Sequence, residues 1–233
     1  MTATQEFRPL RLMKVVITSA TEKEIIQLKG KIVDFSANFG ALSIHFHTSG
    51  VGLLAASFSI TRLIYEEKPD LIIQLGIAGC FDSKMELGKV VIVKEDGLGD
   101  QGVEENGRFI DLFDDKQLIR NGKPINLKKM PNPFLNDLNF SFLDEVTACT
   151  VNEVTTHPLR IQQLIENNHF TIETMEGASL HYCCLQLGIP FVQIRAISNY
   201  IGERDKTKWK FSEAFNNLAI EGYNFMERLN ALQ

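Results

Sequence analysis

Apolar and polar residues follow one another in blocks that predict alternating strands and helices. Two short apolar runs, "MKVVIT" (13–18) and "LIIQLGIAG" (71–79), have the length and composition of strands covered on both faces. After the first run, "SATEKEIIQLKG" (19–30) predicts a helix that begins with a capping box formed by Ser19 and Glu22 and ends at Gly30. Before the second run, "GVGLLAASFSITRLIYEEKPD" (50–70) has apolar residues at helical spacing and predicts a helix ending before its proline.

The second half of the chain repeats this alternation after a polar interruption. Residues 97–140 are polar and rich in Gly, Asn and Pro, so we expect a loop or an insertion with few core residues. The remaining predicted elements are strands at 89–95, 147–151 and 191–198, a helix at about 175–187, and a last helix carrying apolar residues from Phe215 to Leu229.

This order of elements predicts an α/β fold, a three-layer α/β/α arrangement around a central mixed, mostly parallel sheet. In such sheets ligands bind where strands end. Thr18, Gly76 and Ser198 stand at or near predicted strand ends and are followed by small or polar residues, so we look for chemistry there.

Size and charge narrow the classes of partner. The chain has 233 residues, which suits one domain, and we predict an N-terminal tail at 1–11 and a single domain at 12–233. The net charge is −5 and no Lys/Arg block occurs, so we expect a small-molecule partner and no nucleic acid or membrane. Without a long apolar run or a signal peptide, a cytoplasmic location is the default expectation.

The cysteines and histidines do not form a metal-binding pattern. Cys80, Cys149, Cys183 and Cys184 lack the paired spacing of zinc ligands or a disulfide framework, and we interpret them as buried small side chains. His45 and His47 would share one face of a strand, but no further ligand accompanies them, so we interpret them as surface histidines and expect no metal.

Several motifs together resemble those of the nucleoside phosphorylase and nucleosidase superfamily. They are "TSATEKEI", "LGIAG", "ETMEGASL" and "RAISN", in this order over roughly residues 13–230. Within the superfamily the chain is similar to the methylthioadenosine/S-adenosylhomocysteine nucleosidases, and "GDQGVE" and "RAISNYIGERDKTKW" resemble the futalosine hydrolases more closely. The resemblance implies cleavage of an N-glycosidic bond of a purine nucleoside without a cofactor, by a homodimer or higher oligomer.

The resemblance assigns the sugar site and the nucleophile to two carboxylates. Glu176 matches the glutamate that binds the ribose hydroxyls, and Met175 would pack under the ribose; a first-turn acid of a helix is the structural alternative for Glu176. Glu24 matches the residue that activates water in nucleosidases, and an exposed glutamate of the first helical turn is the alternative. The arginines that bind phosphate in phosphorylases are missing, and a carboxylate would repel phosphate, so hydrolysis is favoured.

The leaving group is assigned to Asn199, where the nucleosidases acting on adenine nucleosides have an aspartate. An amide N–H can donate to both O6 and N7 of a 6-oxopurine such as hypoxanthine, whereas an ionised carboxylate would repel both. Ser198 either holds this amide in place or is a turn residue. The resemblance also implies that Ala78 and Gly79 bring backbone close to the ligand, and that the loop with Asn152 and Val154 binds the base.

We therefore predict a futalosine hydrolase-like enzyme that releases hypoxanthine from a 5′-modified inosine. Arg204 would bind the carboxylate of the 5′ substituent, unless "GERDKTKW" is only a solvated charged loop. The alternatives are a methylthioadenosine-type nucleosidase, a purine nucleoside phosphorylase, and a relative that binds ligands without catalysis.

Overall fold

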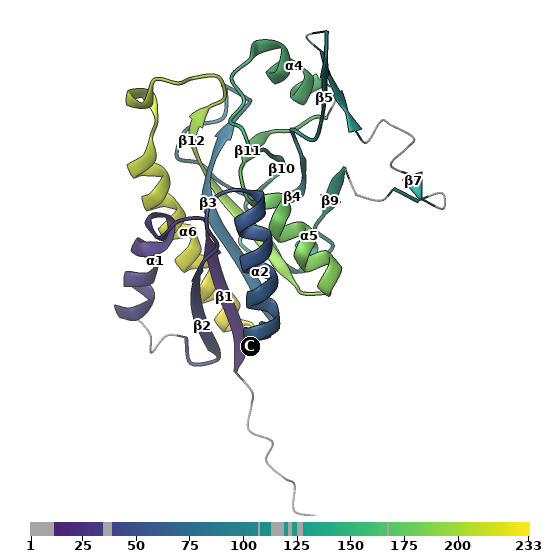
Figure 1. Cartoon of the computed structure of the whole chain (residues 1–233). Coiled ribbons are helices and arrows are strands. Elements are labelled where there is room, and N and C mark those ends of the chain that lie inside the picture. Colours follow the sequence, from purple (N-terminus) through teal and green to yellow (C-terminus); the bar gives the residue numbers. More distant parts are fainter. Residues whose placement is uncertain are drawn as a thin grey trace, which may run out of the picture.

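The fold is built on a sheet in which strands from both halves of the chain alternate (Figure 1). The computed structural model describes residues 12–34, 39–106, 108–112, 119–120, 123–124, 128–166 and 168–233. The predicted tail, residues 1–11, lies outside the described residues. The strands are β1 (Met13–Ser19), β2 (Leu42–Thr48), β3 (Leu71–Cys80), β4 (Val90–Leu98), β5 (Gly102–Glu105), β6 (Arg108–Asp111), β7 (Ile119–Arg120), β8 (Lys123–Pro124), β9 (Lys129–Pro131), β10 (Asp144–Thr150), β11 (Ile172–Thr174) and β12 (Phe191–Tyr200).

The main sheet has the strand order β11-β10-β4-β12-β3-β1-β2, and β9 is added to β4. The pairs β1–β2, β1–β3, β3–β12, β4–β10 and β10–β11 are parallel. The pairs β4–β12, β4–β9 and β3–β11 are antiparallel. The sheet is therefore mixed and mostly parallel, as predicted.

Helices cover both faces of the sheet, which completes the predicted three layers. In Figure 1, α2 and α5 lie in front of the sheet, whereas α1 and α6 lie together on the other side. The helices are α1 (Glu22–Asp34), α2 (Leu53–Glu67), α3 (Leu135–Leu138), α4 (Pro158–Glu166), α5 (Gly177–Leu187) and α6 (Phe211–Ala231), with a 3₁₀-helix at Lys206–Lys208.

Each helical layer has its own core. The α1/α6 side packs residues such as Leu28 and Phe225 against β1, β3 and β12, and the α2/α5 side packs Ile60 and Leu180 against the opposite face. These four side chains are fully buried, which is the main stabilising contribution of each layer. The sheet is therefore packed between two apolar layers, and its strand ends lie at one edge of these layers.

Two local predictions about the first helix are wrong. Helix α1 continues through Gly30 to Asp34, because an interior glycine only weakens a helix and nothing requires the left-handed backbone there. The capping box is not Ser19 and Glu22 but Thr21 and Glu24: the Glu24 carboxylate accepts the Thr21 backbone N–H at 2.9 Å.

The polar segment 97–140 is less irregular than expected. It contains β5, β6, β9 and α3, and it contributes Met130 and Leu135 to the buried core. The strand β11 and the helix α4 were not predicted.

The four cysteines are buried and free, which confirms their interpretation as small core side chains. His45 and His47 lie on β2 as expected, but they are half-buried rather than surface residues. His47 lies 2.9 Å from both the Thr18 hydroxyl and the Ser59 hydroxyl, and burial lowers its pKa. Among the described residues, no three His, Cys, Asp or Glu side chains could hold a metal ion together. Within the same residues, no helix is long and apolar enough to cross a membrane.

Candidate active site

A cavity of about 250 Å³ opens at the edge of the sheet where β1, β3, β11 and β12 end. This is the position at which ligands bind in open α/β sheets. Its walls are formed by Ala20, Thr21, Lys23, Glu24, Val51, Ile77, Ala78, Gly79, Val154, Glu173, Thr174, Met175, Glu176, Ser198, Asn199, Ile201, Trp209 and Phe215.

All the predicted site residues except Asn152 and Arg204 line this cavity. The side chain of Asn152 is exposed, and its backbone N–H donates to the Asp100 carboxylate. Arg204 is also exposed, with its guanidinium 5.6 Å from the ring centroid of Trp209, which is itself a wall residue. Arg204 therefore lies next to a wall residue without lining the cavity itself.

Glu24 is positioned by the start of α1. Its Oε2 accepts from the Thr21 N–H at 2.9 Å and the Thr21 hydroxyl at 3.1 Å, and its Oε1 accepts from the Ile77 N–H at 3.2 Å. The side chain is buried, which excludes the alternative of an exposed first-turn glutamate. Oε2 accepts two hydrogen bonds and Oε1 only one, so Oε1 can still accept from a water in the cavity.

Glu176 immediately precedes α5 but does not cap it. The first N–H groups of α5 are satisfied by hydroxyls instead: Gly177 donates to Thr174 and Ala178 donates to Thr150. The Glu176 carboxylate turns away and accepts from the Gly52 N–H at 3.0 Å. Glu176 therefore stands before the first turn of α5 rather than in it, and the buried carboxylate lines the cavity.

Arg195 supplies the positive charge near both carboxylates. Its Nη2 donates to the Gln74 side-chain oxygen at 2.7 Å, and its Nη1 lies 3.9 Å from Glu176 Oε2. Gly76 makes room for it, because an added Cβ would lie 2.2 Å from Arg195 Nη1 and 3.0 Å from Glu24 Oε1. Burial raises the pKa of Glu176, while Arg195 and the Gly52 N–H partly offset that rise. Arg195 is thus a buried ion-pair partner of Glu176.

The orientation of the Asn199 amide follows from its neighbours. The amide nitrogen lies 3.2 Å from the Tyr200 carbonyl, which can only accept, so this atom must be the NH2 group. The Ser198 hydroxyl then donates to the amide oxygen at 2.8 Å. Ser198 is more than a turn residue, since it holds the amide oxygen and so leaves the amide nitrogen beside Gly79, a residue of the cavity wall.

A cluster of buried polar side chains lies beside the start of α5. Asp96 is fully buried; its Oδ1 accepts from the Thr150 hydroxyl at 2.9 Å, and burial raises its pKa to about 6. His181 is also fully buried, and burial lowers its pKa to about 4. Gln193 lies close to both, and Gly177 leaves room for Asp96 and Gln193 to approach each other. We expect these groups to support the floor of the site rather than to meet a ligand.

Several wall residues were not anticipated from the sequence. Val51, Ile201, Trp209 and Phe215 give the cavity its apolar part, and Lys23 gives it a cation. Trp209 ends the run "RAISNYIGERDKTKW", which carries part of the family resemblance, but no role was predicted for it.

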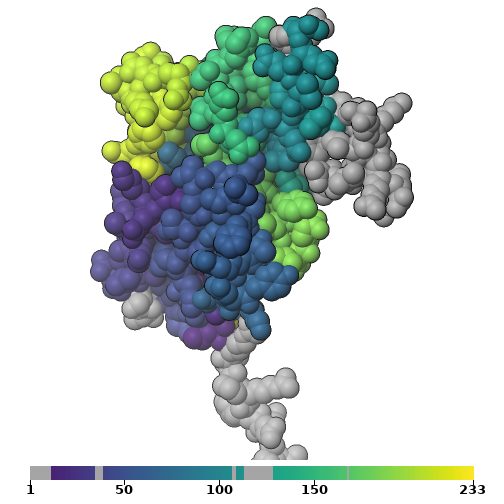
Figure 2. All heavy atoms as spheres, viewed as in Figure 1, coloured from purple at the N-terminus to yellow at the C-terminus, as the bar shows by residue number. Residues whose placement is uncertain are grey.

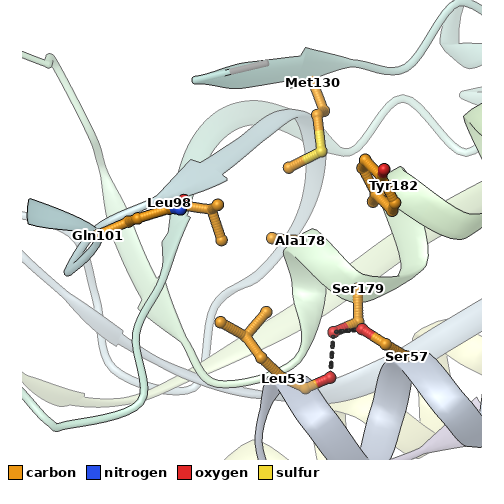
Figure 3. Close-up of a pocket in the computed structure, with 8 residues that line it drawn as sticks. All are labelled: Leu53, Ser57, Leu98, Gln101, Met130, Ala178, Ser179 and Tyr182. Carbon is orange, nitrogen blue, oxygen red and sulfur yellow. Dashed lines mark hydrogen bonds between the residues drawn. The ribbon is translucent and has the colours of Figure 1, made fainter. Parts of the chain in front are cut away.

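A second cavity of about 230 Å³ lies between α2, α5, β4 and β9 and is mainly apolar (Figure 3). Leu53, Met130 and Tyr182 point toward it, and the Ser179 hydroxyl donates to the Leu53 carbonyl at its margin. None of its wall residues is acidic or basic, so it lacks the chemistry of the first cavity.

The comparison with known proteins agrees with this geometry. The family model of the Phosphorylase superfamily matches residues 15–229. A 5′-methylthioadenosine/S-adenosylhomocysteine nucleosidase of Shewanella oneidensis is 30% identical over 201 residues, 80% of this chain and 84% of that protein. The corresponding nucleosidase of Shewanella halifaxensis is 28% identical over 212 residues, 80% of this chain and 86% of that protein. The chain belongs to the phosphorylase superfamily.

Within that superfamily, the chain is an N-glycosyl hydrolase of the nucleosidase group. Its fold is similar to a Helicobacter pylori methylthioadenosine nucleosidase mutant holding 5′-methylthioadenosine, with a TM-score of 0.72, 16% identity, and coverage of 92% of this chain and 99% of that one. It is also similar to the native futalosine hydrolase of Helicobacter pylori, with a TM-score of 0.70, 16% identity, and coverage of 91% and 98%. These two likenesses concern the fold alone.

Proposed function

We propose that the protein is a futalosine hydrolase, which releases hypoxanthine from futalosine, a 5′-modified inosine, in menaquinone biosynthesis. The observation that carries the proposal is the Asn199 amide in the cavity wall: its oxygen accepts from Ser198, one N–H donates to the Tyr200 carbonyl, and the second N–H is left for a ligand. Such a donor suits O6 and N7 of a 6-oxopurine. The cytoplasmic location predicted from the sequence stays a prediction.

The two carboxylates would share the work at the sugar. Glu176 would accept hydrogen bonds from the ribose hydroxyls, and its negative charge would stabilise the oxocarbenium-like transition state. Glu24 would accept a proton from the water that attacks C1′. The positive charge of Arg195, which lies near both carboxylates, offsets part of their mutual repulsion.

The base would leave with the electron pair of the broken N-glycosidic bond. An N–H of Asn199 would stabilise the negative charge that develops at N7 and O6. Because an amide is not an acid, the proton that completes hypoxanthine would come from water. Neither step needs a metal or an organic cofactor.

The 5′ substituent of futalosine carries a carboxylated aromatic ring. Val51, Trp209 and Phe215 offer an apolar wall for a ring, and Lys23 is the wall's cation. The carboxylate contact predicted for Arg204 stays a prediction; Arg204 could reach the ligand only beside Trp209.

A second copy of the chain is expected against α2. Leu54 and Phe58 are 86% and 67% exposed and lie one helical turn apart on α2, next to Val51 of the cavity wall. In Figure 2 the blue surface of α2 faces the viewer beside the green surface of α5. A homodimer that buries this face would also close the cavity.

The test is product analysis with futalosine, inosine and methylthioadenosine, each with and without phosphate. We expect free hypoxanthine from futalosine at a rate that does not depend on phosphate. Release of base only when phosphate is present would indicate a phosphorylase, and no release from any of the three would overturn the proposal.

A methylthioadenosine/S-adenosylhomocysteine nucleosidase is the second candidate, because the curated relatives carry that name. It predicts adenine release from methylthioadenosine by the unchanged protein. Under our proposal, only Asn199→Asp should gain that activity, because a protonated or shared carboxyl suits adenine N7 and the 6-amino group.

A further inference from the structure

Glu173 is a second buried carboxylate in the cavity wall, and the steps described so far do not use it. It lies on β11, is 5% exposed, and its Oε1 accepts from the Thr155 backbone N–H at 3.0 Å. Its Oε2 is buried without a hydrogen-bond partner among the described residues. A buried carboxylate oxygen without a donor is costly, and burial raises the pKa of Glu173.

Arg160 does not satisfy that oxygen. Its guanidinium donates to the Gly99 carbonyl and to the Gln163 side chain, and it stacks over the Phe109 ring. The Thr155 side chain and, from further away, Arg160 partly offset the rise in the pKa of Glu173, but neither makes a hydrogen bond to Oε2. A ligand donor is therefore the natural partner for Glu173 Oε2.

The strand register puts Glu173 and Asn199 on either side of Gly79. Glu173 pairs with Gly79 across β11 and β3, and Asn199 pairs with Gly79 across β12 and β3. Strands lie about 4.8 Å apart, so the two flanking Cα atoms are about 10 Å apart. Residues in register point to the same face. The strands lie beside one another in the upper half of Figure 1.

Gly79 lies between the two side chains in the cavity wall. A Cβ on Gly79 would lie 3.3 Å from the Asn199 amide nitrogen and 2.3 Å from Ile201 Cδ1, so the Asn199 amide lies on this face and Ile201 packs into the space that a Cβ would fill. Ser198 is the extra residue where the β12–β3 register shifts, which sets Asn199 level with Gly79. This part of the wall has an acceptor on one side of Gly79 and a donor on the other.

The edge of a 6-oxopurine has the complementary order of groups: a donor at N1–H and acceptors at O6 and N7. Adenine has an acceptor at N1, which a carboxylate oxygen would repel. We infer that Glu173 Oε2 accepts the N1–H of the purine while Asn199 donates to O6 or N7. This inference rests on the proposed release of hypoxanthine. Glu173 would then be a specificity-determining residue for purines that carry hydrogen on N1.

The substitution Glu173→Gln tests this with little change of shape. The Thr155 N–H would hold the amide oxygen, so the new NH2 would take the place of Oε2 and meet N1–H as a second donor. Calorimetric binding of free hypoxanthine, 1-methylhypoxanthine and adenine gives a readout that is independent of turnover. We expect the natural protein to prefer hypoxanthine over the 1-methyl base by about ten-fold or more, and Glu173→Gln to lose that preference.

Two comparisons make the result decisive. The exposed Glu153→Gln on the neighbouring loop should leave all three affinities unchanged, and Glu173→Asp should keep the order of preference with weaker binding. An equal loss of affinity for all three bases, or no N1 discrimination by the natural protein, would overturn the inference. If futalosine is not cleaved but N1 discrimination is present and lost in Glu173→Gln, the proposed substrate fails while the role of Glu173 stands.

Discussion

Asp96 makes the stability of the protein depend on pH in a direction opposite to that of most carboxylates. Burial raises the pKa of this side chain from its ordinary 3.8 to about 6 in the folded protein. Between these two values the unfolded chain is ionised at Asp96 while the folded chain is protonated there, so the folded state binds more protons. Stability contributed by this site therefore falls as the pH rises through the window.

The magnitude follows from the width of the window. Each pH unit between 3.8 and about 6 changes the free energy of unfolding by about 1.4 kcal/mol, which gives about 3 kcal/mol in total. In the variant Asp96→Asn the side chain carries no charge at any of these pH values, and its amide oxygen can still accept from the Thr150 hydroxyl. We therefore expect Asp96→Asn to gain about 3 kcal/mol relative to the natural protein between pH 3.5 and pH 7.

The assay is urea unfolding followed by the fluorescence of Trp209, the single tryptophan, at several pH values for both proteins. Burial lowers the pKa of His181 to about 4, so protonation of His181 destabilises the fold as the pH falls. His181 is present in both proteins, and its contribution cancels in the difference. The exposed Glu104→Gln is the control, and its difference should be flat. A flat difference for Asp96→Asn, or one that shrinks with rising pH, would refute the reasoning.

Three further predictions concern the site and its surroundings. Glu24→Gln should lower kcat by about 100-fold or more while nucleoside binding measured by calorimetry persists, and undiminished turnover would remove Glu24 from the mechanism. Gly76→Ala should cost about 2 kcal/mol of stability in urea unfolding because its Cβ would meet the buried guanidinium at 2.2 Å; Gly30→Ala, with open space, should instead gain about 0.5–1 kcal/mol. Leu54→Arg with Phe58→Glu should yield monomers in sedimentation velocity, and an unchanged mass would contradict the α2 interface.

Much of the fold could be predicted because its strands are long and buried on both faces. Runs such as 13–18 and 71–79 are apolar in almost every position, and only a covered parallel sheet accommodates them. The prediction failed where elements are short: β11 has three residues, too few for any periodicity, and it exists because it pairs with β3 and β10. The local pattern of apolar and polar residues does not indicate which distant segments will pair.

The candidate site, like the fold, could be predicted only in part. Glu24, Glu176 and Asn199 could be anticipated because each follows a recognisable strand or motif, and the structure brings them to one cavity. The buried Glu173 could not be interpreted, because its meaning depends on the register that places it opposite Asn199 across β3. Register is set by long-range hydrogen bonds rather than by neighbours in the chain.

The register shift at Ser198 limits how this protein can evolve a new base preference. Side chains alternate between the faces of a strand, so loss of that one residue would turn position 199 toward the opposite layer and remove the amide from the cavity wall. Point substitutions at positions 173 and 199 keep the backbone and change only the pattern of donors and acceptors. We therefore expect paralogues with other base preferences to differ by substitution at these two positions, with the length of the strand between 191 and 200 held constant.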